Sequence, residues 1–351
     1  MKRFSAIGLS VLLSFMAFGA NAQFITIRQD AANQKVDVWC GDELFTSYCY
    51  NPYYWRPSFY PVNAPGHLTV TRGWPWQPRP HEHADHPHQY GLTFIYGDVN
   101  GFDFWNGSWA RTAQELYRYG KIKTARISDI ANGDGNARMV VQTEWFDAGN
   151  NLLLLEEVTY LFGCRGDMRW IERHTVLTAV HEKVTFGDNK EGLWFIRLDK
   201  AFEEPAAAPE LHTDALGYTM TEKTIWNEGA QGMIRNDRGD EKEAGTFSKP
   251  TRWLSNSTVK NGEKVTIVLM DHPKNPGYPA RAFSRGYGMM ALNNIGTRCY
   301  TPSAEPTQLV LEKGASVTFR HKFVVVSGRD LPRNEIEKIF DDFHPALVAY
   351  Q

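Results

Sequence analysis

The chain has 351 residues, and its 38 basic and 40 acidic residues give a formal net charge of −2. A charge this close to zero excludes the basic footprint that is typical of nucleic-acid-binding proteins. The four cysteines are too few to form a disulfide framework for a chain of this length. Beyond the N-terminal region, no segment approaches the roughly 20 apolar residues of a transmembrane helix, so we expect no insertion into a membrane.

The N-terminal region has the pattern of a secretory signal peptide. Lys2 and Arg3 form a basic start, residues 6–19 are apolar, and residues 20–22 have the small-x-small pattern of a cleavage site. No cysteine lies directly after this cleavage site, so no lipid anchor is expected. We therefore expect cleavage after Ala22, a mature chain of residues 23–351 that forms a single β-sandwich domain, and a periplasmic or secreted protein.

Short segments with period-2 alternation of apolar and polar residues recur along the chain, which is the pattern of half-buried β-strands. The clearest covers residues 317–325, and residues 309–312 precede it across a short turn, which predicts a hairpin. Further strands are predicted at residues 24–28, 35–40, 67–71, 139–146, 152–162, 169–177, 193–198 and 264–270. The sequence therefore predicts an all-β fold, a large antiparallel β-sandwich.

One helix is predicted, at the C-terminus. Asp330 can cap it, Pro332 falls in its first turn, and its apolar residues form one stripe, namely Ile336, Ile339, Phe340 and Phe343. We expect this short helix to lie as a lid over one edge of the sheets. Residues 203–240 show weak periodicity and are expected to form a long excursion between strands.

Two smaller features of the composition leave alternatives open. Cys40 and Cys49 flank a short polar turn, so a disulfide across a hairpin is one arrangement that the sequence allows. Aromatic residues make up 13% of the chain, with 11 Trp and 15 Tyr. Such rings stack on sugars, but they also bury large areas in protein cores. For any single Trp, core packing is the stronger interpretation.

Four of the 11 histidines lie within residues 81–88. Pro87 disfavours helix at His86, so we expect an extended segment in which His86 and His88 face the same side. Two imidazoles on one face can bind a metal, or one can act as an acid while its neighbour tunes its pKa. We expect His81 and His83 to lie in an exposed loop without a function.

Three groups of motifs resemble the DUF6807 family, whose members often carry the label "methane oxygenase PmoA". They are residues 85–105 with Asp-His-Pro-His, Gly-Asp-Val-Asn-Gly and Asp-Phe-Trp, residues 188–197 with Lys-Glu and Arg, and residues 271–293 with a second Asp-His-Pro. The resemblance implies a β-sandwich related to the galactose-mutarotase supersandwich, in bacteria that degrade complex glycans. Gln89 and Tyr90 stand where the family usually has His and Arg. An oxygenase of the methane monooxygenase type is a membrane protein, and the sequence argues against that activity.

These motifs supply the candidate site residues, which we expect to converge on one concave face. The catalytic candidates are His88, His272, Lys190 and Glu191, and the substrate-binding candidates are His86, Asp98, Asn100, Trp105, Arg197, Arg285 and Asn293. His88 and His272 are expected to act as acid and base across a cleft, while Lys190 and Arg197 hold substrate oxygens. Glu172 and His174 are secondary candidates, interpreted first as a polar pair on a sheet surface.

No cofactor is certain, but a divalent metal is left open. Convergent histidines such as His86 and His88 would indicate zinc, and Asp85, Asp98 and Asp103 would indicate calcium. The function that these features favour is an exported carbohydrate-active enzyme that acts on a glycoside or oligosaccharide by His, carboxylate and Lys chemistry. Hydrolysis, elimination and epimerisation all remain open. The alternative is a non-catalytic glycan-binding protein of the cell envelope.

Overall fold

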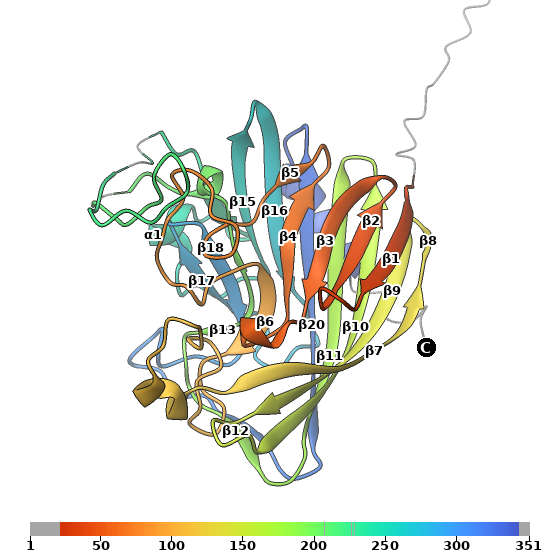
Figure 1. The fold of residues 1–351 in the computed structure, drawn as a ribbon, viewed down its shortest axis with the longest axis vertical. Coiled ribbons are helices and arrows are strands. Elements are labelled where there is room, and N and C mark those ends of the chain that lie inside the picture. The colour runs from red at the N-terminus through yellow and green to blue at the C-terminus, as the bar shows by residue number, and fades with distance from the viewer. Residues whose placement is uncertain (1–21, 207, 226, 228, 344–351) are drawn as a thin grey trace, which may run out of the picture.

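The computed structural model describes residues 22–206, 208–225, 227 and 229–343, and they form two large antiparallel sheets that face each other (Figure 1). The predicted signal peptide lies outside the described residues except for Ala22. In the described part of the chain, no helix is long and apolar enough to cross a membrane. The all-β class predicted from the sequence is confirmed, and so is the short C-terminal helix.

The first sheet has ten strands, and its order in space differs from the order in the chain. Its strands in spatial order are β17 (Arg281–Arg285), β18 (Met289–Asn293), β13 (Gly192–Arg197), β6 (Leu92–Tyr96), β4 (Ser58–Ala64), β3 (Glu43–Cys49), β2 (Lys35–Cys40), β1 (Phe24–Asp30) and β8 (Gly133–Asp134), with β5 (Leu68–Thr69) paired to β4. The strands β13 and β6, which carry the motifs of the candidate site, are therefore neighbours although about 100 residues separate them.

The second sheet has eight strands. In spatial order they are β14 (Met233–Asn236), β15 (Trp253–Lys260), β16 (Glu263–Asp271), β20 (Ser316–Ser327), β11 (Met168–Ala179), β10 (Leu152–Arg165), β9 (Asn136–Phe146) and β7 (Lys121–Ala131). A separate ladder joins β12 (Val184–Phe186) to β19 (Leu309–Leu311). The short helical elements are η1 (Pro52–Tyr54), η2 (Ala113–Arg118), η3 (Lys200–Phe202), α1 (Lys242–Thr246) and α2 (Arg333–Phe343).

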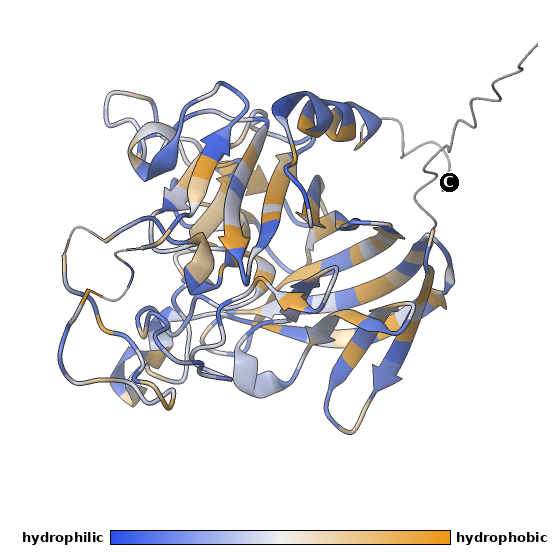
Figure 2. Ribbon diagram, turned by 90° about the horizontal axis from the view of Figure 1, so that it is seen from above, coloured by the Kyte–Doolittle hydropathy of each residue, from blue (hydrophilic) through white to orange (hydrophobic). Residues whose placement is uncertain are grey.

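The main core lies between the two sheets. Phe94 of β6 packs against Phe319 of β20 with ring centroids 5.8 Å apart, and Tyr48 of β3 lies 5.8 Å from Tyr160 of β10. These contacts follow from the period-2 alternation, which turns every second side chain of a strand toward the opposite sheet. The same alternation is visible along the strands in Figure 2 as successive hydrophobic and hydrophilic segments.

Every strand predicted from the sequence overlaps a strand of the structure, but the predicted hairpin is wrong. Leu309–Leu311 pairs with Val184–Phe186, whereas the following strand β20 pairs with β11 and β16. The turn between β19 and β20 redirects the chain instead of closing a hairpin, with Gly314 donating its N–H to the carbonyl of Ala179. Several strands of the structure, including β3, β4, β6 and β7, are not among those predicted from the sequence.

The disulfide across a Cys40–Cys49 hairpin is also wrong. Cys40 of β2 bonds to Cys164 of β10, so the bridge joins the two sheets, and Cys49 is a free thiol. Cys49 lies beside Tyr60, whose carbonyl accepts its S–H at 3.3 Å. The alternation along β2 and β10 turns Cys40 and Cys164 into the shared core, where both are fully buried.

The C-terminal helix α2 packs on a face of the eight-stranded sheet and not over an edge. Its four predicted apolar residues are all buried, and they form a second core with Trp253 of β15 and with residues of β16 and β20. Figure 2 shows the hydrophobic side of α2 turned toward the strands. The helix therefore covers the side of this sheet that faces away from the main core.

Candidate functional site

The candidate site lies on the outer face of the ten-stranded sheet. Trp194 of β13 points inward, because its ring stacks on His321 of β20 with centroids 6.3 Å apart. By alternation, Phe195 and Arg197 point to the outer face, where Trp105 packs on Phe195 at 4.7 Å. Residues 72–91, the start of β13 and the β17–β18 connection surround this face.

A carboxylate with two buried arginines forms the base of the site. Asp85 Oδ1 accepts from Arg197 Nη2 at 2.8 Å and from Arg72 Nη1 at 2.5 Å. Both arginines are buried. Burial opposes ionisation of this carboxyl, but Arg197, the bond to His86 and Arg72 outweigh it and hold the pKa of Asp85 well below its usual range. Asp85 is therefore an anion held in a fixed orientation.

This anion orients the imidazole of His86. His86 Nδ1 hydrogen-bonds to Asp85 Oδ2, and its ring stacks on Tyr287 with centroids 5.4 Å apart and an interplanar angle of 20°. The His86 side chain keeps 43% of its surface exposed. A carboxylate fixes the tautomer and direction of the imidazole it binds, so the opposite nitrogen of His86 is available to a ligand in solvent.

The backbone at His86 differs from the predicted extended segment. Its φ is 46°, in the left-handed region that non-glycine residues rarely adopt. As a result His86 and His88 do not face one side in parallel, and their rings meet edge-on with centroids 5.5 Å apart and planes at 79°. Such strain is typical of functional segments whose surroundings hold the backbone in place.

His88 is buried, with 5% of its surface exposed. Desolvation and the nearby Arg56, His86 and Arg111 lower the pKa of His88 well below its usual value. The imidazole is therefore neutral at neutral pH, and the protonated imidazolium, the usual general-acid form of histidine, is not populated. His88 Nδ1 is buried without a hydrogen-bond partner among the described residues. These surroundings favour His86 over His88, the first choice from the sequence, as the acid–base residue.

Glu191, at the start of β13, supplies a second titratable group. Asn106 Nδ2 donates to Glu191 Oε2 at 2.8 Å and also to Asp103 Oδ2 at 2.9 Å. Burial, together with the charge of Asp103, raises the pKa of Glu191, while Asn106, Lys190 and His86 oppose the shift. Lys190 is exposed beside it. The charges of Lys190 and His86 thus act on Glu191, and His86 is connected to Arg197 through Asp85.

Four of the predicted substrate-binding residues have structural roles instead. Asp98 accepts the N–H of Gly101 in a turn, and Asn100 bonds to backbone groups of residues 183 and 185. Trp105 is 1% exposed because it packs against Phe195 and Phe283 on the outer face of the sheet. Asn293 accepts two backbone N–H groups of its own loop. Trp105 and Asn293 are buried, and the side chains of Asp98 and Asn100 bond to the backbone of loops, so these contacts assign the four residues to the structure of the fold.

Two arginines predicted to bind substrate are already paired. Arg197 Nη1 donates to Gln89 Oε1 at 2.8 Å in addition to its bond with Asp85, and its guanidinium lies 4.3 Å from the centroid of Tyr287. Arg285 donates to Glu243 Oε1 at 3.0 Å. Arg197 therefore acts on the site through Asp85. Gln89, which departs from the family pattern, keeps a role as the acceptor for Arg197.

His272 does not join this site, so the predicted single site containing both Asp-His-Pro segments is wrong. Its ring lies 5.0 Å from that of Phe343 in α2, on the outer side of the other sheet. The neighbouring Asp271 points into the main core and accepts from Asn294 and Asn275. Adjacent residues of a strand point to opposite faces, which is why Asp271 does not orient His272.

The structure also shows residues that the sequence analysis did not assign to the site. Arg72, Tyr287 and Asn106 hold Asp85, His86 and Glu191 respectively, and they lie on other segments. Trp109 lies three residues after Asn106 and is 51% exposed. His83, expected in an exposed loop, is 3% exposed and bonded to Glu203. Nothing in the local sequence distinguishes these residues from structural ones.

A cavity of about 290 Å³ opens beside Tyr287, and Asn227, Glu243 and His83 contribute to its wall. A second cavity of about 400 Å³ lies on the eight-stranded sheet, lined by Trp170, Glu172 and Lys322 among others. Glu172 pairs there with Lys322 at 2.9 Å and with His174 at 3.7 Å, as the polar-pair interpretation predicted. Only the first cavity adjoins the Asp85–His86 pair.

Comparison with solved structures gives remote likenesses. The GH36 alpha-galactosidase AgaB from Geobacillus stearothermophilus has a TM-score of 0.42 and 8% identity, over 86% of this chain and 41% of that one. The chain thus spans less than half of that enzyme. A protein from Synechocystis sp. PCC 6803 has a TM-score of 0.33 and 9% identity, over 90% and 99%. A galactose mutarotase related enzyme from Lactobacillus acidophilus has a TM-score of 0.28 and 10% identity, over 87% and 98%.

No curated protein matches the sequence. The model of DUF6807, described as a family of unknown function, matches residues 35–341. The matched residues include all three groups of motifs that carried the resemblance, together with Asp85, His86, Glu191 and Arg197. The chain belongs to the DUF6807 family.

Proposed function

We propose that this protein is an exported carbohydrate-active enzyme in which His86 and Glu191 transfer protons on a bound sugar. The observations that carry the proposal are an exposed imidazole, oriented by the half-buried Asp85, and the half-buried carboxyl of Glu191, whose pKa the charge of His86 lowers. An acid and a base held on neighbouring segments are the minimum equipment for general acid–base catalysis. Export is proposed from the sequence pattern of residues 1–22.

The surroundings of Glu191 favour elimination or epimerisation over hydrolysis. Hydrolysis normally uses two carboxyl groups that both reach the glycosidic bond. The second carboxylate near Glu191 is Asp103, whose Oδ1 accepts the N–H groups of Trp105 and Asn106 and whose Oδ2 accepts from Asn106 Nδ2. Asp103 therefore supports the loop. Abstraction of a proton from carbon needs only one base and one acid, the roles assigned to Glu191 and His86.

The remaining roles follow from exposure and charge. Lys190 is the exposed cation beside Glu191 and would stabilise negative charge that develops on a substrate oxygen. Trp109 is the exposed aromatic side chain closest in sequence to Asn106 and would stack on a sugar ring. Arg197 and Arg72 hold Asp85 in place, so they are positioning residues.

The test is to incubate the mature protein with a panel of oligosaccharides and 3-keto-glycosides in D₂O. Products are followed by mass spectrometry and proton NMR, which detect elimination by loss of mass and epimerisation by deuterium uptake at carbon. His86→Asn and Glu191→Gln should each lower turnover by about 10²–10⁴-fold, the usual contribution of one acid–base group. His181→Asn, at an exposed histidine outside the site, is the matched control.

The second candidate function is a glycan-binding protein without catalysis. It is favoured by the many hydrogen bonds and ion pairs that already occupy Arg197, Arg285 and Asp85. Calorimetric binding of an oligosaccharide that is lost in Trp109→Ala, with no conversion of any substrate in the panel, would support this candidate and contradict the enzyme.

A further inference from the structure

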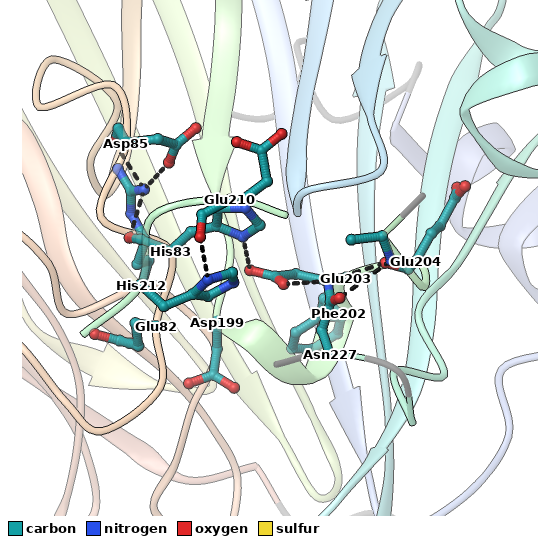
Figure 3. Close-up of polar contacts among 12 residues, drawn as sticks. Glu82, His83, Asp85, Asp199, Phe202, Glu203, Glu204, Glu210, His212 and Asn227 are labelled. Atoms are coloured by element: carbon teal, nitrogen blue, oxygen red, sulfur yellow. Dashed lines mark hydrogen bonds and ion pairs between the residues drawn. The ribbon is translucent and has the colours of Figure 1, made fainter. Parts of the chain in front are cut away.

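Figure 3 shows that the side chains of His83, Glu203 and His212 lie together. The cavity beside Tyr287 adjoins them, since His83 lines it. Their potential ligand atoms all lie within 4.8 Å of one another. His83 Nδ1 lies 2.9 Å from Glu203 Oε1, and the two imidazole rings have centroids 4.4 Å apart. The three residues are 3%, 1% and 1% exposed, so this cluster is almost completely buried.

The long excursion after η3 builds this cluster. Glu203 directly follows η3, and His212 pairs through its backbone with His83 in an isolated antiparallel bridge. The excursion thus returns two side chains to the histidine-rich segment, which no local pattern of residues 203–240 indicated. Buried polar groups cost free energy unless they are satisfied, so three of them that converge on one point indicate a partner that they bind.

We propose that His83, Glu203 and His212 bind a divalent first-row metal ion, with zinc as the best match. Two histidines and one glutamate form a donor set found in catalytic zinc sites, which leave a fourth position for water or substrate. In a tetrahedral site with ligand distances near 2.0–2.1 Å, donor atoms lie about 3.3 Å apart. The donor atoms here all lie within 4.8 Å of one another, so each pair needs to approach by about 1.5 Å at most to match this geometry.

The hydrogen bonds of His212 point to a ligand independently. His212 Nδ1 lies 3.0 Å from the carbonyl oxygen of Glu210, and a carbonyl can only accept, so Nδ1 carries the proton. Nε2 then has a free lone pair. This atom is buried and has no hydrogen-bond partner among the described residues. A histidine that donates one N–H to a backbone carbonyl and presents the other nitrogen is the arrangement of a metal-ligating histidine.

Glu203 is oriented in the same manner. Asn227 Nδ2 donates to Glu203 Oε2 at 2.8 Å, which leaves Oε1 directed at His83. Among the described residues, His83 is the one ion-pair partner found for Glu203. A bound cation would balance this buried carboxylate, and the Asn227 bond would hold the ligand oxygen in place.

The location of the metal site connects it to the cavity. The ring of Tyr287 lies 6.2 Å from that of His83 and 5.4 Å from that of His86. His83, Asn227 and Tyr287 all line the cavity. The open position of the ion would therefore bind an oxygen of a ligand in the cavity. The inference stands on the cluster itself and does not depend on the proposed acid–base function.

The experiment measures metal binding directly. The mature chain, purified without a histidine tag, is stripped with a chelator, titrated with Zn²⁺ by calorimetry, and analysed for bound metal by mass spectrometry. We expect about one zinc per chain and a rise in melting temperature with Zn²⁺, because a ligand that binds only the folded state stabilises it. Co²⁺ bound at the same site should give the visible absorption of a tetrahedral ion.

Three variants make the test specific. His212→Ala and Glu203→Gln should both reduce bound zinc to near zero while circular dichroism shows a folded protein. Glu203→Gln preserves side-chain shape and so covers the case in which His212→Ala fails to fold. His86→Ala should retain about one zinc, because His86 belongs to the neighbouring pair. Absence of first-row metal binding by the wild-type chain, or loss of zinc in His86→Ala but not in His212→Ala, would overturn the inference.

Discussion

Arg197→Met is the perturbation that best tests how the candidate site is held together. Arg197 is fully buried and makes bonds of 2.8 Å to both Asp85 and Gln89, with its guanidinium over the ring of Tyr287. Methionine fills a similar volume without the charge. Removing one partner of a buried ion pair costs about 3–5 kcal/mol, because the other charge stays buried.

We expect the low end of this range, about 3 kcal/mol, because Arg72 remains bonded to Asp85. At about 2 °C per kcal/mol for a large domain, the melting temperature should fall by roughly 6 °C. Calorimetry measures this, and Arg126→Met, at an exposed arginine of β7, is the control. In a double-mutant cycle, Asp85→Asn combined with Arg197→Met should destabilise less than the sum of the single changes.

Turnover in the D₂O assay should also fall in Arg197→Met, since a loosely held Asp85 no longer orients His86. An unchanged melting temperature, or additive effects in the cycle, would refute the reasoning that Arg197 acts through Asp85. Loss of stability without any change in turnover per folded molecule would show that the orientation of His86 does not matter for the chemistry.

Three further predictions follow from individual contacts. Lys190→Met removes a charge that lowers the pKa of Glu191, so the acidic limb of the kcat/KM profile should move to higher pH. Lys183→Met, at another exposed lysine, is the control and should leave this limb unchanged. Cys164→Ser removes the disulfide between residues 124 apart in sequence, and by the chain-entropy relation the free energy of unfolding measured in urea should fall by about 5 kcal/mol. Cys299→Ser, at an exposed free thiol, should change this free energy little. Burial opposes the ionisation of Asp188, but backbone N–H groups of residues 298, 299 and 307 hold the pKa of this carboxyl well below its usual value. The stability that this carboxylate contributes is present above about pH 4 and is lost as the pH falls further. The difference in melting temperature between wild type and Asp188→Asn should therefore be large at pH 7 and become smaller on acidification.

The elements that the sequence determined are those with a local periodic signal. Alternation along residues 35–40 and 317–325 identified strands, and the stripe from Ile336 to Phe343 identified α2, because side-chain direction in a strand or helix follows from backbone geometry alone. The family motifs also supplied His86, Lys190, Glu191 and Arg197 as candidates for one site, and their shared function stays a prediction. Short, fully buried strands such as β6 show no alternation, which is why they were missed.

Only the tertiary structure decided which strands and cysteines pair and on which face of the molecule each segment lies. The separation of His272 from His86 follows from the packing of His272 against Phe343 of α2. The strand partner of Leu309–Leu311 and the disulfide partner of Cys40 both depend on contacts between segments more than 100 residues apart. The same holds for the meeting of His83 with Glu203 and His212. Two Asp-His-Pro segments look alike in the sequence, but each is placed by its own sheet, and the burial of apolar faces between the sheets fixes which side of the molecule each one occupies.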